Sequence, residues 1–316
     1  MLVGIAQIAP VVLDREATLD KVVHRIEEAG KGGLKLVAFG EALVPGYPVW
    51  LSRTGGARFD DDDQKELHAR YLDQGVDIAA GHLDRVCEAA RAGGVAVVLG
   101  AMERASDRGG HTLYCSCVYI GPDGTVGSSH RKLVPTYEER LSWGAGDGAG
   151  LVVHDLPPFR VGALNCWENW MPMARASLYA AGENVHVAIW PGSDHNTGDI
   201  TRFIARESRS YVISASGLLR EEDFPADVPS RERIVPTKGE MLQNGGSAAA
   251  GPDGEWILEP VVDEECLLTV ELDHQKVLCE RQNFDASGHY SRPDVLRLHV
   301  DRRRQSTVEW SDGPDA

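Results

Sequence analysis

The hydrophobic and polar positions of the chain follow two periods over its first two thirds. Short, continuous apolar runs that are typical of buried strands occupy 2–8, 34–40 and 95–100. Between these runs, at 16–30 and at 76–94, apolar residues recur at helical spacing, and both segments end in glycine. Alternation of strands and helices in this order predicts a layered α/β domain.

The pattern then changes to hairpins. The tripeptide Pro-Asp-Gly separates two strand-like runs in TLYCSCVYIGPDGTVGSSHRK, and it recurs in GGSAAAGPDGEWILEP. Between these turns we expect a hairpin around 156–159, strands at 160–166, 185–190 and 212–217, a helix at about 170–181 and a further helix just before 212. Mixed sheets with helices outside fit this order. Without an internal repeat or linker, we expect one domain over 1–300 and a short C-terminal tail over 301–316.

Composition and charge narrow the class of protein. The chain has 316 residues, of which 42% are hydrophobic, so it can bury a large core. Its formal net charge of −16 argues against a nucleic-acid-binding protein, because such proteins neutralise phosphates with clustered lysines and arginines. No window has the roughly 18 apolar residues that a membrane span needs, and the first residues lack a basic segment before an apolar run. We therefore expect a cytoplasmic protein without a membrane partner.

Six cysteines are present without a CxxC pair or the regular spacing of a disulfide framework, so we expect reduced thiols. Cys115 and Cys117 share one face of a predicted strand, since side chains two residues apart point the same way. Together with His111 they imitate a metal site, but zinc ligands normally lie on turns as separated pairs. We predict that both cysteines belong to the core and that the chain has no metal site.

Cys166 stands where the predicted strand 160–166 ends, a few residues before a helix. Backbone N–H groups at a strand end and helix start carry partial positive charge, which favours thiolate over thiol. The segment CWENWMP adds an acid, an amide and two tryptophans beside this thiol. These residues alone leave two interpretations open, a structural cysteine and a nucleophile in a dry cavity.

Two further segments place charged groups at strand ends. Glu41 directly follows the apolar run 34–40, where partial desolvation raises the pKa of a carboxyl group and suits it to general acid and base work. Lys132 leaves a hairpin strand, and an ammonium beside a thiolate would stabilise developing negative charge. For Glu41 the alternative is a salt-bridged or N-capping glutamate at the start of a loop. For Lys132 the alternative is an ordinary charged loop.

Glu41, Lys132 and Cys166, in this order, resemble the catalytic set of the carbon–nitrogen hydrolase superfamily. The segments FGEALVPGYP, HRKLVPTYEERLSWGAGDG and GALNCWENWMP are similar to the three motifs of that superfamily. FDASGHYSRPDVLRL is similar to the end of its nitrilase branch. The resemblance covers most of the chain and implies a nitrilase.

The resemblance also implies a role for each matching residue. Glu41 is the general base, Lys132 stabilises the tetrahedral intermediate and Cys166 is the nucleophile. A second active-site glutamate, seven residues after the lysine, falls on Glu139, with the adjacent Glu138 as the alternative. Four aromatic side chains are predicted to line the substrate pocket: Tyr47, Trp143, Trp167 and Trp190. The backbone N–H of Trp167 is implied to help hold the developing charge.

The implied reaction converts a nitrile to a carboxylic acid and ammonia through a thioimidate and a thioester on Cys166. It needs neither a metal nor an organic cofactor, and the glycine-rich run 144–150 matches no nucleotide-binding motif. The nearest alternatives are an amidase of the same superfamily and a cyanide-degrading relative. A papain-like protease is disfavoured because neither His154 nor His186 has a protease context. A non-enzymatic scaffold would leave Cys166 no more reactive than the other five cysteines.

The family fold is an αββα sandwich with mixed sheets, which dimerises into a four-layer αββα-αββα assembly. The resemblance therefore implies a homo-oligomer, a dimer or larger. The chain ends soon after the RPDV segment, which argues against extended spirals.

Overall fold

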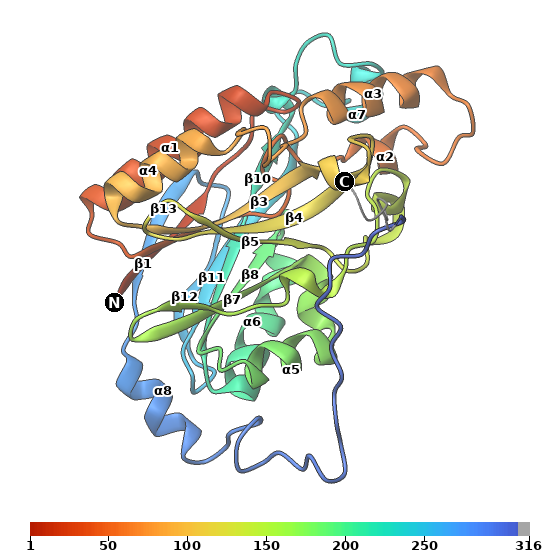
Figure 1. The fold of residues 1–316 in the computed structure, drawn as a ribbon. Helices are drawn as coiled ribbons and strands as arrows, with labels where there is room; N and C mark the ends of the chain where they lie inside the picture. The colour runs from red at the N-terminus through yellow and green to blue at the C-terminus, as the bar shows by residue number, and fades with distance from the viewer. Residues whose placement is uncertain (309–316) are drawn as a thin grey trace, which may run out of the picture.

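Two mixed β-sheets pack face to face between two outer layers of helices (Figure 1). The computed structural model describes residues 1–308, so the last eight residues of the predicted tail, 309–316, lie outside the described residues. Among residues 1–308, no helix combines the length and the apolar composition that a bilayer crossing requires.

The first sheet has six strands in the order β13-β1-β2-β3-β4-β5. Its strands are β1 (Leu2–Gln7), β2 (Leu36–Phe39), β3 (Ala96–Arg104), β4 (Leu113–Ile120), β5 (Val126–Arg131) and β13 (Cys266–Glu271). Neighbours β1, β2 and β3 are parallel, whereas β4, β5 and β13 pair antiparallel to their neighbours. The sheet is therefore mixed, with β13 joining the C-terminal part of the chain to β1.

The second sheet has seven strands, with the order β10-β11-β9-β8-β7-β6 and β12 also paired to β11. Its strands are β6 (His154–Leu156), β7 (Phe159–Asn165), β8 (Val185–Trp190), β9 (Tyr211–Ser216), β10 (Leu218–Arg220), β11 (Met241–Ala250) and β12 (Trp256–Val262). The central strands β7, β8 and β9 are parallel and the outer strands antiparallel. Parallel centres with antiparallel edges thus occur in both sheets, and they explain why the sequence shows both helix-linked strands and hairpins.

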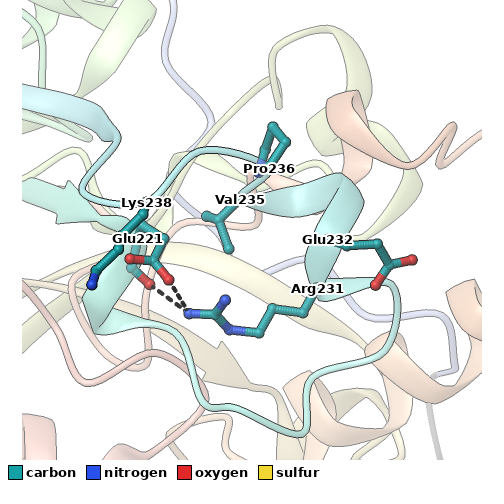
Figure 2. Close-up of a pocket in the computed structure, with 6 residues that line it drawn as sticks. All are labelled: Glu221, Arg231, Glu232, Val235, Pro236 and Lys238. Carbon is teal, nitrogen blue, oxygen red and sulfur yellow. Dashed lines mark hydrogen bonds and ion pairs between the residues drawn. The ribbon is translucent and has the colours of Figure 1, made fainter.

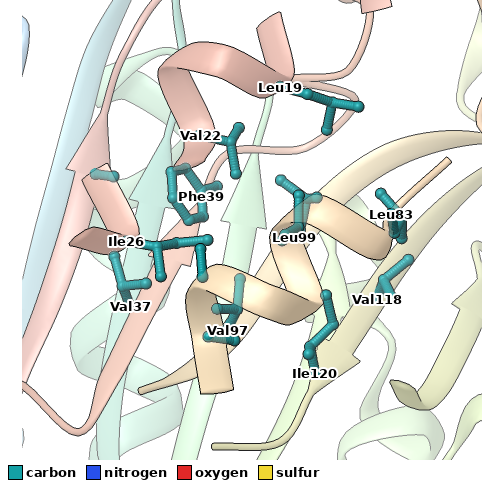
Figure 3. Packing of buried hydrophobic residues seen from close by; sticks show 14 of the residues in the cluster. Leu19, Val22, Ile26, Val37, Phe39, Leu83, Val97, Leu99, Val118 and Ile120 are labelled. Carbon is teal, nitrogen blue, oxygen red and sulfur yellow. The ribbon is translucent and has the colours of Figure 1, made fainter. Parts of the chain in front are cut away.

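Outer helices cover each sheet. Helices α1 (Arg15–Lys31) and α4 (Asp84–Gly93) lie on the first sheet, and α5 (Pro172–Ala180) and α6 (Asp194–Ser208) lie on the second. Figure 3 shows Leu19, Val22 and Ile26 of α1 packed towards Phe39 and Val97 of the first sheet. The remaining α-helices of the described residues are α2 (Trp50–Arg53), α3 (Asp62–Asp73), α7 (Arg231–Ile234) and α8 (His274–Arg281).

The inner strands are buried on both faces. In β2, Leu36 and Ala38 face the second sheet, whereas Val37 and Phe39 face the helices. A strand between two apolar layers gains from hydrophobic side chains at every position. The continuous apolar runs of the sequence are therefore confirmed as buried strands.

Two predicted helix boundaries are wrong. The helix expected over 76–94 begins only at Asp84, because Val76 pairs with Glu103 at the edge of β3 and a turn at Gly81 (φ +82°) intervenes. The helix expected just before 212, over ITRFIARESRSY (200–211), begins earlier, at Asp194, and ends at Ser208. In addition, four consecutive aspartates, 60–63, lie at the start of α3. Asp61 is the N-cap and accepts a hydrogen bond from the Gln64 N–H, and 62–63 begin the helix.

The described part of the predicted tail runs back over the first sheet. Arg304 donates hydrogen bonds to Asp147 Oδ1 (3.0 Å) and to the carbonyl oxygen of Ser129 (2.9 Å). The backbone N–H of Gln305 donates to Asp147 Oδ2 over 2.9 Å. Residues 301–308 are thus tied to the end of β5 and to the turn around Asp147.

Candidate active site

Glu41 follows the C-terminal end of β2 at a point where the two sheets approach closely. Its backbone N–H donates to the carbonyl oxygen of Trp190 at the end of β8, over 3.0 Å. A Cβ on Gly100 of β3 would lie 2.1 Å from the carbonyl oxygen of Gly40, and one on Gly40 would lie 2.6 Å from the N of Gly217. Glycine at these positions lets the strand ends meet, and as a result the Glu41 side chain is buried between them.

Lys132, just after β5, is the centre of a buried charge cluster. Its Nζ lies 2.8 Å from Glu41 Oε1 and 2.8 Å from Glu139 Oε2. The side chains of all three residues are at most 3% exposed. An unpaired charge at this depth would be strongly unfavourable, so the ammonium and the two carboxylates depend on one another.

The structure brings Glu139, and not Glu138, to this lysine. Glu139 is buried in the 3₁₀ turn Tyr137–Leu141, whereas Glu138 is exposed. The Glu139 carboxylate also accepts hydrogen bonds from the Tyr47 hydroxyl (2.7 Å) and from the Thr136 N–H (2.6 Å). Of the two adjacent acids, Glu139 is thus the one that contacts Lys132, and three donors hold it in place.

Two of the predicted aromatic residues border this cluster. The Trp143 ring centroid lies 5.5 Å from Lys132 Nζ, within the range of a cation–π contact. Tyr47 packs edge-on against Trp143 with ring centroids 5.7 Å apart. Tyr47 and Trp143 therefore shield the ammonium from water on one side.

Cys166 is the first residue of the 3₁₀ turn Cys166–Trp170 that follows β7. Its backbone has a φ of +44° and its side chain is buried beside Ala188 and Trp190 of β8. The Asn169 amide donates to the Cys166 carbonyl oxygen over 2.8 Å and fixes the turn. The sulfur is thus presented from a tight, packed turn at the carboxyl end of a central strand.

A buried carboxylate connects the segment of Cys166 to the segment of Lys132. Glu168 accepts hydrogen bonds from the backbone N–H groups of Asn165 (3.0 Å) and Leu133 (2.7 Å). Its oxygens also lie 3.1 and 3.2 Å from His130 Nε2. Glu168, the acid of the CWENWMP segment, therefore holds the Cys166 segment and the Lys132 segment in a fixed relative position.

Positive φ angles recur in all three segments. Ala42 (φ +50°), Tyr137 (φ +44°) and Cys166 (φ +44°) each adopt a left-handed conformation without being glycine. Each such residue costs on the order of 1 to 3 kcal/mol, and such strain concentrates at functional sites. Their position next to Glu41, before Glu139 and at the sulfur itself marks this region as the candidate active site.

Burial controls the proton affinities at this site. It raises the pKa of Glu41 to about 7, against the opposing effect of Lys132. Burial and the negative charge of Glu41 raise the pKa of the Cys166 thiol well above its usual value, although Lys132 and the Trp167 N–H act in the opposite direction. The Trp167 N–H therefore favours the thiolate, in the expected direction, but desolvation outweighs it and the pKa of the thiol stays raised.

Cys115 is a neighbour of the site that the sequence does not reveal. It is buried in β4, as predicted, but its Sγ also lies 3.4 Å from Glu41 Oε1 and 3.9 Å from Asn165 Oδ1. The three residues are far apart in the chain. The strand order β2-β3-β4 of the first sheet brings Cys115 to Glu41, and the packing of the second sheet brings Asn165 of β7 to Cys115. No spacing rule in the sequence could have identified this contact.

The other two predicted pocket residues lie in different surroundings. Trp190 is fully buried, and its indole N–H donates to Ser214 Oγ over 3.3 Å. Trp167 is about one third exposed (36%), and its ring stacks on Trp170 with centroids 4.8 Å apart. The Trp167 ring borders an outer hollow of about 510 Å³ that Tyr137 and Trp170 also line. Trp190 therefore packs beside Cys166, whereas the ring of Trp167 faces outward.

Another hollow, of about 550 Å³, lies away from these residues (Figure 2). It is lined by Glu221, Arg231, Glu232, Val235, Pro236 and Lys238. Figure 2 shows the Arg231 guanidinium paired with the Glu221 carboxylate. None of the predicted site residues lines this hollow, so we assign no chemistry to it.

Comparison with known proteins gives this arrangement a family. Residues 2–278 match the carbon-nitrogen hydrolase family. The chain belongs to this family. A protein called nitrilase 2, from an unknown prokaryotic organism, is 37% identical over 312 residues, which cover 98% of this chain and 95% of the relative. An aliphatic nitrilase from Rhodococcus rhodochrous is 34% identical, with coverage of 98% and 81%. The chain is thus an enzyme of the carbon-nitrogen hydrolase family, similar to nitrilases over nearly its full length.

Solved structures of the family share the fold. A carbon-nitrogen hydrolase from Helicobacter pylori G27 superposes with a TM-score of 0.68 at 18% identity, over 93% of this chain and 96% of that one. An amidase from Nesterenkonia sp. gives a TM-score of 0.65 at 18% identity, over 90% and 94%. These likenesses confirm the predicted fold class, two mixed sheets between layers of helices.

Proposed function

We propose that this carbon-nitrogen hydrolase converts a nitrile to its carboxylic acid and ammonia, with Cys166 as the nucleophile. The observation that carries the proposal is the buried Lys132 ammonium bridged between Glu41 and Glu139, close enough to Cys166 for their charges to act on the pKa of its thiol. The similarity to nitrilases over nearly the full chain supports a nitrile as the substrate. This geometry supports Glu41 as the base, Lys132 as the positive charge and Cys166 as the nucleophile of the proposed reaction.

Proton transfer opens the proposed reaction. Glu41 Oε1 is occupied by Lys132, whereas buried Glu41 Oε2 has no hydrogen-bond partner among residues 1–308 and is available to accept a proton. Transfer of the Cys166 proton to Glu41 creates a thiolate without changing the net charge of the site. Because the pKa of Glu41 is about 7, the group is able both to accept and to return this proton near neutrality.

The thiolate then attacks the nitrile carbon, and the nitrile nitrogen takes up a proton to give a thioimidate. Water that Glu41 deprotonates adds to this carbon, and ammonia leaves to give a thioester on Cys166. A second water releases the carboxylic acid and regenerates the thiol. Lys132, held by Glu139, stabilises the negative charge that develops in the addition steps. The reaction consumes two waters and, as proposed, no cofactor.

The substrate class is tested by ammonia release from aliphatic, aromatic and arylacetonitrile compounds, from the matching amides and from cyanide. We expect release from at least one class of nitrile, with acid as the main product. Release from amides alone would replace the proposal with an amidase, a class that includes the Nesterenkonia structure. Release from cyanide alone would indicate a cyanide-degrading enzyme.

Three further properties belong to the same proposal. The shared core between the sheets supports residues 1–300 as one functional domain, with 301–316 as a tail. We propose a cytoplasmic location, consistent with six free cysteines. We also propose a homo-oligomer, and neither a nucleic acid nor a membrane as a partner, in line with the net charge of −16.

A further inference from the structure

A second thiol touches the proposed base. The Sγ of Cys115 lies 3.4 Å from Glu41 Oε1, within reach of a hydrogen bond from S–H to the carboxylate. The backbone carbonyl oxygen of the same residue accepts from the Lys132 N–H over 2.8 Å. Cys115 is 1% exposed, so water does not compete for either contact. One residue of β4 thus contacts both Glu41 and Lys132.

We propose that Cys115 is a positioning residue, which holds the Glu41 carboxylate through its S–H group and directs Glu41 Oε2 towards the reacting atoms. This inference rests on the proposed role of Glu41 as the base. Oε1 receives the Lys132 ammonium and the Cys115 thiol, and this leaves the unpartnered Oε2 for proton transfer. Cys115 itself forms no bond with the substrate.

The contact affects the charge of Glu41 in a defined direction. A donor stabilises the ionised carboxylate, so the Cys115 thiol lowers the pKa of Glu41 against the larger effect of burial, which raises it. The titratable groups that act on Glu41, or on which Glu41 acts, are Tyr47, Tyr71, Cys117, Lys132, Glu139 and Cys166. Loss of the thiol would leave Lys132 as the remaining hydrogen-bond donor to Glu41 among the described residues.

The test compares the pH dependence of kcat/KM for wild type, Cys115→Ala and Cys115→Ser. Removal of the donor is expected to move the acid limb of the Cys115→Ala profile upward by roughly half to one pH unit. The serine hydroxyl keeps a donor, so its limb is expected to stay near that of wild type. Cys115→Val, which is similar in volume to cysteine, replaces the alanine variant if the latter fails to fold.

Cys117→Ala is the matched control, because Cys117 lies on the same face of the same strand but packs in the core between the sheets. Its acid limb is expected to match wild type. Equal limbs in wild type and Cys115→Ala, or equal shifts in Cys115→Ala and Cys117→Ala, would overturn the inference.

A second readout separates this inference from the proposed function. The rate at which iodoacetamide alkylates Cys166, followed by peptide mass spectrometry, reports the same proton transfer without a nitrile. We expect its pH profile to shift upward in Cys115→Ala. If wild type hydrolyses no nitrile but this shift occurs, the proposed function fails and the inference stands. If nitriles are hydrolysed and neither profile shifts, only the inference fails.

Discussion

At the scale of single residues, the candidate site encloses one ammonium and two carboxylates away from water. Lys132 is 2.8 Å from both Glu41 and Glu139, and these two acids share its charge. Burial and the neighbouring Glu139 raise the pKa of Glu41, and Lys132 lowers it, so that the group titrates at about 7. Burial and the charge of Glu41 raise the pKa of Cys166 in turn, and in the proposed reaction Glu41 removes its proton.

This balance predicts the pH dependence of catalysis. A general base must be ionised, so kcat/KM is expected to rise as the pH increases through about 7, the pKa of Glu41. Initial rates at low nitrile concentration, measured across pH 5 to 9 in one buffer system of constant ionic strength, give this profile. A profile that is flat down to pH 5, as expected for the ordinary glutamate pKa of about 4.3, would contradict the burial argument.

The two adjacent acids provide a matched pair of variants. Glu139→Gln removes a buried partner of Lys132, and its kcat is expected to fall by at least about 100-fold, as for the loss of other electrostatic catalytic groups. Glu138→Gln changes an exposed side chain, and its kcat is expected to stay within about twofold of wild type. Steady-state kinetics and thermal unfolding of both proteins make the comparison. Equal losses in the two variants would show that Glu139 has no special role.

At the scale of elements, close packing of strand ends determines where these residues meet. The approach of β3 to the Glu41 segment depends on Gly100, where a Cβ would lie 2.1 Å from the carbonyl oxygen of Gly40. The three atoms nearest to this Cβ are backbone atoms of Gly40, Glu41 and Ala42, so no flexible side chain could move away to make room. The site is therefore sensitive to volume at a residue that takes no part in the chemistry.

Gly100→Ala is expected to lower the free energy of unfolding by about 3 kcal/mol, because the added methyl group overpacks the strand ends. The control is Gly198→Ala in α6, where a Cβ meets nothing within 4 Å. Alanine at this helical position is expected to raise stability by about 0.5 to 1 kcal/mol. Urea unfolding measures both changes. A neutral Gly100→Ala variant would show that the strand ends have room to separate.

The sequence predicts elements better than it predicts contacts between them. Strand β2 is readable because both of its faces are buried, which gives four consecutive apolar residues. The start of α4 could not be predicted from the sequence, because the apolar spacing of 76–83, which includes the turn at Gly81, also fits a helix. Motifs identify Glu41, Lys132 and Cys166, but the contact of Cys115 with Glu41 spans 74 residues and follows from the strand order β2-β3-β4 within the first sheet.

At the scale of the whole molecule, the two sheets present their strand ends to one site while their helices face outward. Large apolar side chains remain exposed on the outer layer of the second sheet, among them Met173 of α5 (71% exposed) and Phe203 of α6 (54%). We propose these two side chains as contacts of the homo-oligomer, where burial would remove their apolar surface from water. The predicted four-layer dimer would place such a helical layer against its counterpart.

We therefore expect light scattering after size exclusion to give at least twice the chain mass of 34.4 kDa. The double variant Met173→Glu and Phe203→Glu introduces charge on the outer helices and is expected to shift the protein towards monomer. Circular dichroism verifies that the variant is folded. A wild-type mass of one chain across micromolar concentrations would rule out the homo-oligomer.

The central claim is that Cys166 carries the reaction, and the most direct measurement is ammonia release by Cys166→Ala from the best nitrile substrate. Without a nucleophile no thioimidate forms, so the rate is expected to fall by at least about 1,000-fold while the fold, judged by thermal unfolding, is retained. Substitution of Cys117, which is also buried, controls for the loss of a thiol as such and is expected to retain turnover. Turnover by Cys166→Ala within tenfold of wild type would contradict the account.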